Sequence, residues 1–265
     1  MNETEIKGTD PAGEAKTQLQ ASLTDEKRSA LEKYRELTVG RTGFWKFLMF
    51  ELTMFFIAPL PGALGLVLRK KVYPWILGEV GSNVIFGRSI TIRHPAKIRI
   101  DDNTIIDDYA VLDAKGETNQ GIRLGKNVII GRNTVLSCKN GDLIIGNNTN
   151  IAMNCFIQSA KKVEVGDNIL FAAYCYVIGG GDHKTDRTDI PILSQGQVVK
   201  GITIESDCWL GAGVLVCDGV RIGRGTILGA GAVAISDIEP FSVAVGIPAK
   251  VIKSRLQEDD HSGVE

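Results

Sequence analysis

The chain has 265 residues, enough for one large domain with a sizeable core. Its 30 Lys and Arg residues almost balance 31 Asp and Glu residues, and a formal net charge of −1 argues against a nucleic-acid-binding protein. Apolar residues at 44% and charged residues at 23% are typical of globular proteins and exclude wholesale disorder. Glycine, with 30 residues, is over-represented, which favours a fold with many repeated turns.

The cysteines and the first residues indicate the compartment in which the protein works. Five cysteines without a CxxC pair exclude zinc-ribbon and thioredoxin-like motifs, and we expect no metal site. Their number is odd, and the N-terminus is polar and acidic where a signal peptide would be basic and then apolar. Both features predict a reducing, cytoplasmic location.

Two segments precede any repeat. Residues 1–23 are polar and lack apolar periodicity, and we expect them to form a disordered tail. Residues 24–79 are predicted to be helical, beginning with a solvated helix whose N-cap candidate is Thr24.

A hydrophobic stretch, residues 44–77, holds eight of the 17 aromatic residues of the chain. Within it, Leu52–Leu68 is a run of 17 residues without a charge, and three cations follow at once: Arg69, Lys70 and Lys71. A helix of this length spans about 25 Å, which is short of the hydrocarbon core of about 30 Å.

Two prolines, Pro59 and Pro61, interrupt this stretch. We therefore expect a re-entrant or interfacial segment with the three cations at the lipid headgroups, which would place the protein on the inner face of the cytoplasmic membrane. The alternative is a hydrophobic helix that packs on the domain or in an oligomer interface.

From Val80 onwards the sequence repeats with a period of six. The first residue of each unit is bulky and apolar in 20 of 21 cases and is often followed by Gly or Asp. These first residues are Val80, Phe86, Ile92, Ile100, Ile106, Leu112, Leu124, Ile130, Leu136, Ile145, Ile151, Ile157, Val165, Phe171, Val177, Ile204, Leu210, Val216, Ile222, Leu228 and Ala234. A six-residue unit is a short strand with a tight corner, and three units close one triangular coil. The sequence therefore predicts an all-β parallel β-helix of about seven triangular coils over residues 80–237.

Irregular steps mark one edge of this prism. The first residues of successive units are usually six positions apart, but distances of 8, 12, 9, 8 and 27 residues follow the third strand of five coils. All insertions therefore lie on one edge of the prism. We look for a functional site on this edge. The longest insertion, predicted at 179–203, contains three glycines followed by Asp and His183. Residues 238–265 are expected to form a C-terminal cap and tail. Buried structural thiols are predicted at the fifth position of three units: Cys155, Cys175 and Cys208.

The hexads, the long insertion and the ending GVRIGRGTILGAGAVAISDIEPFSVAVGIPAKVIKSR resemble the hexapeptide-repeat acyltransferases over roughly residues 80–255. More narrowly, the chain resembles the branch of galactoside, xenobiotic and polysaccharide O-acetyltransferases. The resemblance implies a left-handed β-helix and a homotrimer with active sites between subunits. It also implies acetyl-CoA as the acyl donor, a co-substrate rather than a permanently bound cofactor.

His183 is the candidate general base. Transfer of an acyl group from a thioester to a hydroxyl needs a base with a pKa near 7, which suits histidine. The other two histidines are His94, in an early coil, and His261, in the polar tail. In the family a histidine on this loop is the base, and His183 matches its position within one residue. A solvated loop histidine is the alternative.

Other polar residues are candidates for orienting groups. Asp182, Asp186 and Asp189 lie close to His183 in sequence, and Asp186 is our choice for the carboxylate that orients the imidazole. A solvated acidic loop is the alternative. Asn154, expected in mid-strand, matches a polar active-site asparagine of the family that would bind the acceptor or the developing oxyanion. The alternative is a corner asparagine that bonds the backbone.

The donor site is predicted from small and basic residues. Trp209 and Ala212 lie beside the long insertion in sequence and Ala230 one coil further, which predicts a channel for the pantetheine arm. Trp209 resembles a family tryptophan near the CoA arm, with a core role as the alternative. Lys250 and Lys253 match basic family positions that reach the CoA phosphates.

These features predict a CoA-dependent O-acyltransferase, specifically an O-acetyltransferase acting on a sugar hydroxyl of a surface polysaccharide or its lipid-linked precursor. Three alternatives stay open: an N-acetyltransferase of an amino sugar, an acyl-ACP-dependent transferase with a lipid acceptor, and a β-helix scaffold without activity. A γ-class carbonic anhydrase is excluded because it needs three histidines around zinc.

Overall fold

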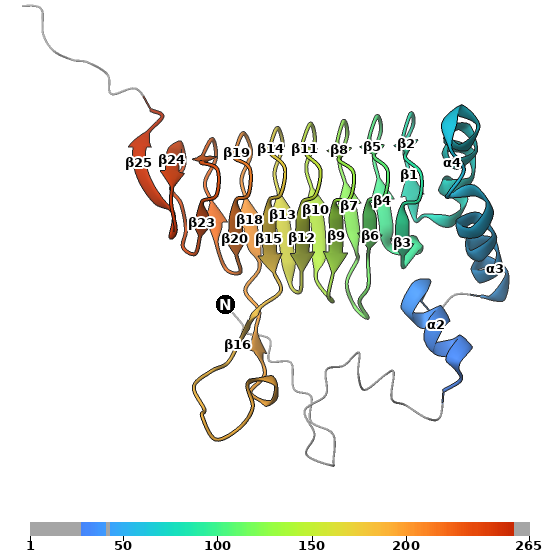
Figure 1. Ribbon diagram of the computed structural model, residues 1–265, viewed down its shortest axis with the longest axis horizontal. Coiled ribbons are helices and arrows are strands. Elements are labelled where there is room, and N and C mark those ends of the chain that lie inside the picture. Colours follow the sequence, from blue (N-terminus) through green and yellow to red (C-terminus); the bar gives the residue numbers. More distant parts are fainter. Residues whose placement is uncertain (1–27, 41–42, 257–265) are drawn as a thin grey trace, which may run out of the picture.

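The computed structural model describes residues 28–40 and 43–256. The predicted disordered tail, residues 1–23, and the proposed N-cap Thr24 lie outside these residues, as does the chain after Leu256. Element labels follow Figure 1.

Helices precede the repeats. They are α2 (Ala30–Thr38), α3 (Phe44–Leu52), the π-helix η1 (Thr53–Ile57) and α4 (Gly62–Ile76). The N-cap of α2 is Ser29, not Thr24: Ser29 Oγ accepts from the Glu32 amide at 3.2 Å, and Glu32 Oε2 accepts from the Ser29 amide at 2.9 Å. The chain breaks between η1 and α4 at Pro59–Pro61, where the sequence predicts a bend.

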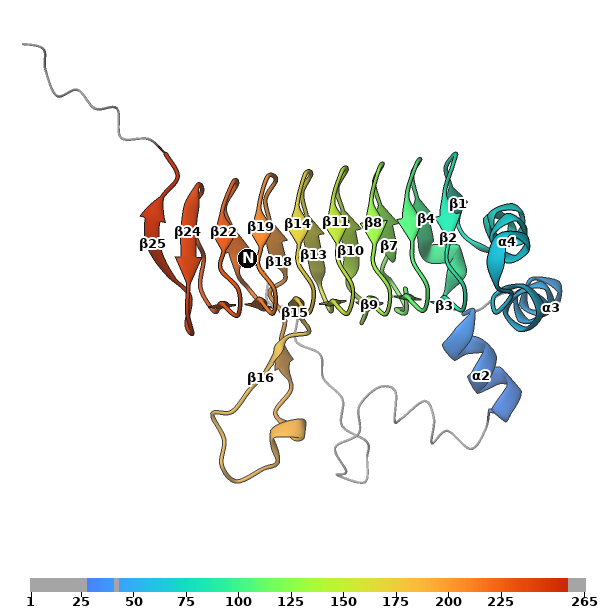
Figure 2. The same ribbon diagram turned by 45° about the horizontal axis from the view of Figure 1, so that its top comes forward.

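The repeats form a three-sided prism of parallel sheets (Figures 1 and 2). Sheet A contains β1 (Glu79–Val80), β4 (Ile98–Ile100), β7 (Ile122–Leu124), β10 (Asp142–Ile145), β13 (Lys162–Val165), β18 (Ile202–Ile204) and β21 (Arg221–Ile222). Sheet B contains β2 (Ile85–Phe86), β5 (Ile105–Ile106), β8 (Ile129–Ile130), β11 (Asn150–Ile151), β14 (Leu170–Phe171), β19 (Trp209–Leu210), β22 (Ile227–Leu228), β24 (Ser242–Val245) and β25 (Lys250–Ser254). Sheet C contains β3 (Thr91–Arg93), β6 (Val111–Asp113), β9 (Val135–Cys138), β12 (Phe156–Ser159), β15 (Tyr176–Gly179), β20 (Leu215–Cys217) and β23 (Val233–Ala234).

Each coil contributes one strand to each sheet, which confirms the predicted β-helix. Seven coils are complete, from β1–β3 to β21–β23. An incomplete eighth follows, because Ile238 bridges to Ile222 on sheet A and β24 pairs with β22 on sheet B. The prism therefore extends past the predicted boundary at residue 237. The antiparallel strand β25 then covers the free edge of β24.

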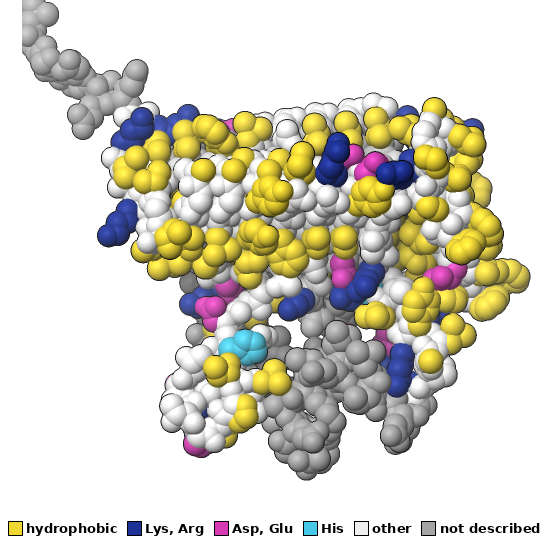
Figure 3. All heavy atoms as spheres, viewed as in Figure 1, with side chains coloured by type: hydrophobic (Ala, Val, Ile, Leu, Met, Phe, Trp, Pro, Cys, Tyr) yellow, Lys and Arg dark blue, Asp and Glu magenta, His cyan; other side chains and the backbone are white. Residues whose placement is uncertain are grey.

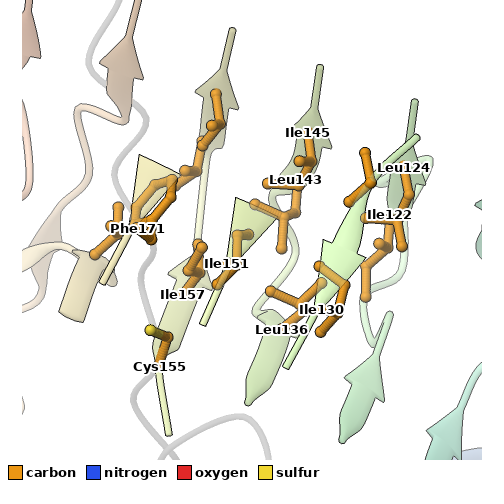
Figure 4. Close-up of a cluster of buried hydrophobic side chains, with 14 of the residues drawn as sticks. Ile122, Leu124, Ile130, Leu136, Leu143, Ile145, Ile151, Cys155, Ile157 and Phe171 are labelled. Atoms are coloured by element: carbon orange, nitrogen blue, oxygen red, sulfur yellow. The ribbon is translucent and has the colours of Figure 1, made fainter. Parts of the chain in front are cut away.

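The period of six places one side chain per unit inside the prism. Of the 21 first residues, 20 are buried, and Val80, which opens the first coil, is half-buried. Figure 4 shows Leu124, Ile130 and Leu136 of the third coil beside the matching residues of the fourth, which are Ile145, Ile151 and Ile157. The prism is thus filled by stacked rows of aliphatic side chains.

The predicted structural thiols are confirmed. Cys155, Cys175 and Cys208 are buried, as is Cys138. Burial raises the pKa of Cys208 to about 11 and that of Cys138 to about 12. A thiol that keeps its proton is a poor nucleophile, so Cys138 and Cys208 serve packing.

Polar side chains stack along the edge between sheets A and B. The corner residues there adopt a positive φ that asparagine tolerates well. Each side-chain amide donates to the next coil: Asn127 to Asn148 at 2.8 Å and Asn148 to Asn168 at 3.0 Å. Asn168 then donates to Asp207 at 3.0 Å, and Arg224 Nε binds the other oxygen of that carboxylate at 2.8 Å. We call this row the amide ladder.

The helices cover the end of the prism at which the first coil lies (Figures 1 and 2). Tyr73 of α4 is fully buried, and its ring centroid lies 4.9 Å from that of Phe86 in β2. Phe50 of α3 and Ile76 of α4 belong to the same hydrophobic core as the prism interior. This part of the segment is therefore a packing element that closes the core.

Arg69 is buried, which corrects the expectation that it reaches lipid headgroups. Its Nε donates to the Phe86 carbonyl at 3.0 Å, and its Nη1 donates to the Leu60 carbonyl at 2.6 Å and the Ala58 carbonyl at 3.4 Å. The proline break leaves carbonyls at the end of η1 without helical partners, and Arg69 satisfies them. A Cβ atom on Gly65 would collide with the Leu60 carbonyl, so glycine is required for this close approach.

Candidate active site

Insertions gather on the edge between sheets C and A, as the irregular steps predict. Two are substantial: residues 114–121, between β6 and β7, and residues 180–201, between β15 and β18. We call the first the packed insertion and the second the hairpin insertion. The latter is shorter than the predicted range 179–203, because Gly179 ends β15 and Ile202 begins β18.

The hairpin insertion projects from the prism (Figures 1 and 2). It contains an antiparallel pair, β16 (Asp182–His183) and β17 (Gln197–Val198), and a 3₁₀ turn, η3 (Ile192–Ser194). Its return to sheet A is fixed by Asp218, whose two carboxylate oxygens accept from the amides of Lys200 and Gly201 at 2.8 and 2.9 Å.

His183 is exposed on this hairpin and faces Gln197 across it. The side-chain amide nitrogen of Gln197 lies 2.7 Å from Nε2 of His183. An amide N–H donates only to an unprotonated ring nitrogen, so this contact fits the neutral tautomer with its proton on Nδ1. The lone pair of Nε2 is then the basic site of the ring. Sequence reasoning missed Gln197, which is separated from His183 by 14 positions and becomes visible only through the hairpin register.

The three candidate carboxylates have different surroundings. Asp189 pairs with Arg187, whose Nε donates to Oδ1 at 3.0 Å, and this contact lowers the pKa of Asp189. Asp182, next to His183 in β16, raises the pKa of the Cys217 thiol through its charge, after the larger effect of burial. The role assigned to Asp186 stays a prediction.

Asn154 does not lie in mid-strand, which corrects the sequence expectation. It occupies the corner between β11 and β12 with φ of 59°, on the edge between sheets B and C. The neighbouring coils place Asn133 and Tyr174 at the same corner with φ of 57° and 63°. The position therefore selects a residue that tolerates a left-handed backbone, which favours the corner alternative.

The predicted donor residues follow one line toward the C-terminal end. Trp209 lies on the outer face of β19 and is 51% exposed, so it is not a core residue. Ala212 and Ala230 stack at the edge between sheets B and C, where the Gly231 amide donates to the Ala212 carbonyl at 2.8 Å. Their side chains are exposed.

The line ends at the hairpin formed by β24 and β25. Lys250 pairs with Val245 and Lys253 with Val243, and both lysines are exposed. We call Trp209, Ala212, Ala230, Lys250 and Lys253 the donor strip. Within one chain the donor strip and His183 belong to different edges of the prism, so a single chain does not gather them into one site.

His94 does not join this site. His94 packs against Gly40 in the first coil, where its amide donates to the Thr38 carbonyl at 2.7 Å and burial lowers the pKa of its ring. His261 lies outside the described residues. Among residues 28–40 and 43–256, no group of three or more His, Cys, Asp or Glu side chains is arranged to hold a metal ion.

A family model identifies the repeat. The model described as bacterial transferase hexapeptide (six repeats) matches residues 201–234, from β18 to β23. The chain contains the bacterial transferase hexapeptide repeat. The observed coils and this match confirm the family resemblance that the hexads indicate.

Curated relatives of this hexapeptide-repeat protein are named acetyltransferases. A probable acetyltransferase of Mycobacterium tuberculosis is 36% identical over 134 residues, which cover 51% of this chain and 44% of the relative. The galactoside O-acetyltransferase of Escherichia coli is 28% identical over 172 residues, 63% of this chain and 75% of the relative. The chain thus spans less than half of the length of the Mycobacterium relative.

Solved structures share the fold. The polySia specific acetyltransferase NeuO superimposes with a TM-score of 0.51 at 22% identity, covering 70% of this chain and 88% of that protein. The UDP-N-acetylglucosamine acyltransferase of Campylobacter jejuni also has a TM-score of 0.51, at 20% identity, covering 68% of this chain and 67% of that protein. At these identities the likeness concerns the β-helix.

Proposed function

We propose that this hexapeptide-repeat protein is a CoA-dependent O-acetyltransferase of a saccharide hydroxyl. The observation that carries the proposal is the exposed His183 on the hairpin insertion, with its Nε2 lone pair directed to a hydrogen-bond donor. Acetyl transfer is also the activity in the names of the curated relatives. The acceptor is a hydroxyl of a surface polysaccharide or of its lipid-linked precursor.

The proposed reaction needs one base. As the acceptor oxygen attacks the thioester carbonyl of acetyl-CoA, Nε2 of His183 takes the hydroxyl proton in place of the Gln197 amide. The new C–O bond forms, the C–S bond breaks, and the imidazolium returns its proton to the CoA thiolate. The proton on Nδ1 stays in place throughout, so the tautomer that fits the Gln197 contact is the one the reaction uses.

The donor strip supports an elongated donor. Exposed alanines at the edge between sheets B and C leave the backbone accessible to a pantetheine arm, and Lys250 and Lys253 supply cations for the CoA phosphates. Because His183 lies on another edge of the prism, we propose that the site is shared between copies in a homotrimer. Exposed hydrophobic side chains on the outer faces of the strands, among them Leu170 and Tyr176, support such packing. Figure 3 shows rows of hydrophobic side chains along one side of the prism.

The first test is acetyl-CoA cleavage, followed by detection of the free thiol, with and without saccharide acceptors. We expect thiol release that depends on the acceptor, and mass spectrometry of the product should show an acetyl ester. Release without any acceptor dependence, or none at all, would support the scaffold alternative. An amide product from an amino sugar would instead identify N-acetylation.

The second test asks whether the lysines of the donor strip contact the CoA phosphates or act only as general surface charge. Lys250→Ala and Lys253→Ala should each raise the KM for acetyl-CoA by roughly tenfold or more, since a charge-assisted contact contributes about 1.5–3 kcal/mol. The KM for acetyl-pantetheine, which lacks the nucleotide phosphates, should stay the same. Lys161→Ala, an exposed lysine outside the strip, is the matched control. Equal changes in the KM for both donors would show that these lysines do not contact the nucleotide phosphates.

A further inference from the structure

The helices at the end of the prism expose an apolar surface on the side away from it. On α3 and η1 the exposed side chains include Trp45 at 78% and Phe55 at 74%, and on α4 they include Trp75 at 76%. We call these three residues, together with Leu52, Phe56 and Leu64, the cap surface. Figure 3 shows hydrophobic side chains gathered at this end of the molecule.

The cap surface is not needed to close the core. In α4 one face is buried against the prism, and its residues are Gly65, Arg69, Tyr73 and Ile76. The opposite face follows a helical spacing of three and four positions and is exposed, with Leu64, Val67, Lys71 and Trp75. Across α3, η1 and α4 the cap surface exposes two tryptophans and two phenylalanines, and exposed apolar surface of this kind marks an interaction site.

The charges around the cap surface are mostly positive. The sequence from Leu52 to Gly78 contains no Asp or Glu. Lys46, Lys70 and Lys71 are exposed beside the aromatic residues. Glu51, the acidic residue within α3, accepts a hydrogen bond from the Tyr34 hydroxyl at 3.0 Å. Aromatic and aliphatic side chains flanked by lysines match the boundary between acyl chains and anionic headgroups.

We propose that the cap surface docks on the interface of an anionic lipid bilayer, with the aromatic side chains at the acyl boundary and the lysines among the headgroups. Within the described residues no helix is long and apolar enough to cross a membrane, so the helices would lie in the interface. The buried Arg69 stays in the protein and takes no part. This proposal is independent of the acetyl-transfer reaction.

Two other possibilities fit the exposed side chains less well. A symmetric dimer through the cap surface would bring Lys70 and Lys71 of two copies together without acidic partners in the segment. The opposite end of the prism also exposes apolar side chains, such as Ile252 and Leu256. There, however, the exposed large apolar side chains are aliphatic, whereas the cap surface exposes two tryptophans and two phenylalanines.

The experiment uses the full chain and sedimentation with vesicles of phosphatidylcholine alone or with 30% phosphatidylglycerol. We expect binding to the anionic vesicles to be at least about tenfold tighter, and to weaken with added salt, because each exposed lysine near the surface contributes to attraction. Absence of binding to the anionic vesicles would overturn the proposal.

Two sets of substitutions separate the apolar and electrostatic contributions. Trp45→Ser, Phe55→Ser and Trp75→Ser together should weaken binding to anionic vesicles at least about tenfold. Lys70→Gln with Lys71→Gln should weaken it by up to about twentyfold and remove the preference for anionic lipid. Since all five side chains are exposed, the melting temperature should stay unchanged.

Ile252→Ser with Leu256→Ser, at the opposite end of the prism, is the matched control and should leave vesicle binding unchanged. If this control weakens binding as much as the cap substitutions, the docking surface is not the cap. Sedimentation velocity without lipid tests whether the cap surface binds a second copy of the chain instead. A lower oligomeric state of the aromatic triple variant, without any change in vesicle binding, would identify a second copy of the chain as the partner.

Discussion

The two insertions on the edge between sheets C and A begin and end alike but differ in their outer parts. Each returns to sheet A by donating two successive backbone amides to one carboxylate of the next coil. In the packed insertion, Gln120 and Gly121 donate to Asp142 at 2.6 and 3.0 Å. In the hairpin insertion, Lys200 and Gly201 donate to Asp218 in the same manner.

Away from this anchor the packed insertion is held by the prism itself. Asn119 is buried; its amide nitrogen donates to the Gly141 carbonyl at 3.0 Å, and its oxygen accepts from Lys97 Nζ at 2.9 Å. The hairpin insertion is instead held by contacts within itself, such as Gln195 Nε2 to the Arg187 carbonyl at 2.7 Å, and exposes His183. Of the two, the hairpin insertion is therefore the better candidate for a site, because the His183 side chain faces outward.

The largest expected effect sharpens this contrast. His183→Ala should lower kcat/KM by roughly 10²–10⁴, the usual contribution of a positioned general base. Because the side chain is exposed, the midpoint of thermal unfolding should not change. Steady-state rates of thiol release and a melting curve measure both. A variant within threefold of the wild-type rate would remove the proposed mechanism.

The matching change in the packed insertion should affect stability instead. Asn119→Ala leaves the Gly141 carbonyl and the Lys97 ammonium without their buried partner and should lower the free energy of unfolding by about 2–3 kcal/mol. Chemical denaturation measures the loss. Activity per folded molecule should stay within twofold. If it fell as far as in His183→Ala, the packed insertion would have to be counted as part of the site.

A smaller effect is expected from the residue that faces His183 across the hairpin. Gln197→Ala removes the donor to Nε2 that fits the Nδ1–H tautomer, and kcat should fall by about tenfold with little change in KM. Gln197→Glu places a carboxylate beside the ring, which favours the imidazolium, so the acid limb of the pH–rate profile should move to higher pH. An unchanged profile in Gln197→Glu would show that this contact does not persist in the active state.

The smallest effect concerns His94, which lies outside the packed and hairpin insertions. Burial lowers the pKa of His94, and the neighbouring charges are Lys97 and Lys115, which lower it further, and Asp113, which raises it. The unfolded chain therefore binds a proton more readily, so this contribution to stability is present above the unfolded pKa near 6.5 and is lost as pH falls through it. His94→Asn, which keeps the left-handed backbone at φ of 52°, should reduce the loss of stability between pH 7 and 5. An identical pH dependence of unfolding in this variant would assign the loss to other groups.

The fold could be predicted from the sequence because one rule, an apolar residue every six positions, is repeated 21 times and then confirmed by burial. Errors arose where a single residue had to be placed. Arg69 was assigned to headgroups from its charge and its neighbours, since the sequence does not show the carbonyls that η1 leaves unpaired. Asn154 was assigned to mid-strand, although its position in the hexad is the corner that Asn133 and Tyr174 also occupy.

The sequence singles out His183 because histidines are few and one of them lies in the longest insertion. Its role as the general base stays a prediction. Gln197 could not be found, because its proximity depends on where an irregular loop turns back on itself. The donor strip was predicted as one group, and the coils do place it on one line, but nothing in a single sequence shows that this line and His183 occupy different edges.

Because the coils stack at a regular spacing, the number of coils sets the length of the prism. The hairpin insertion leaves the fifth coil, so it is separated from the helices by four coil spacings, about 19 Å along the axis. Between Asn127 and Asn168 the rungs of the amide ladder are 20 or 21 residues apart, and the step to Asp207 is 39 residues because it includes the hairpin insertion. A gain or loss of one regular coil would preserve both the ladder and the apolar rows. Evolution can therefore lengthen or shorten the distance between the two ends in fixed increments of about 4.8 Å without redesigning either one.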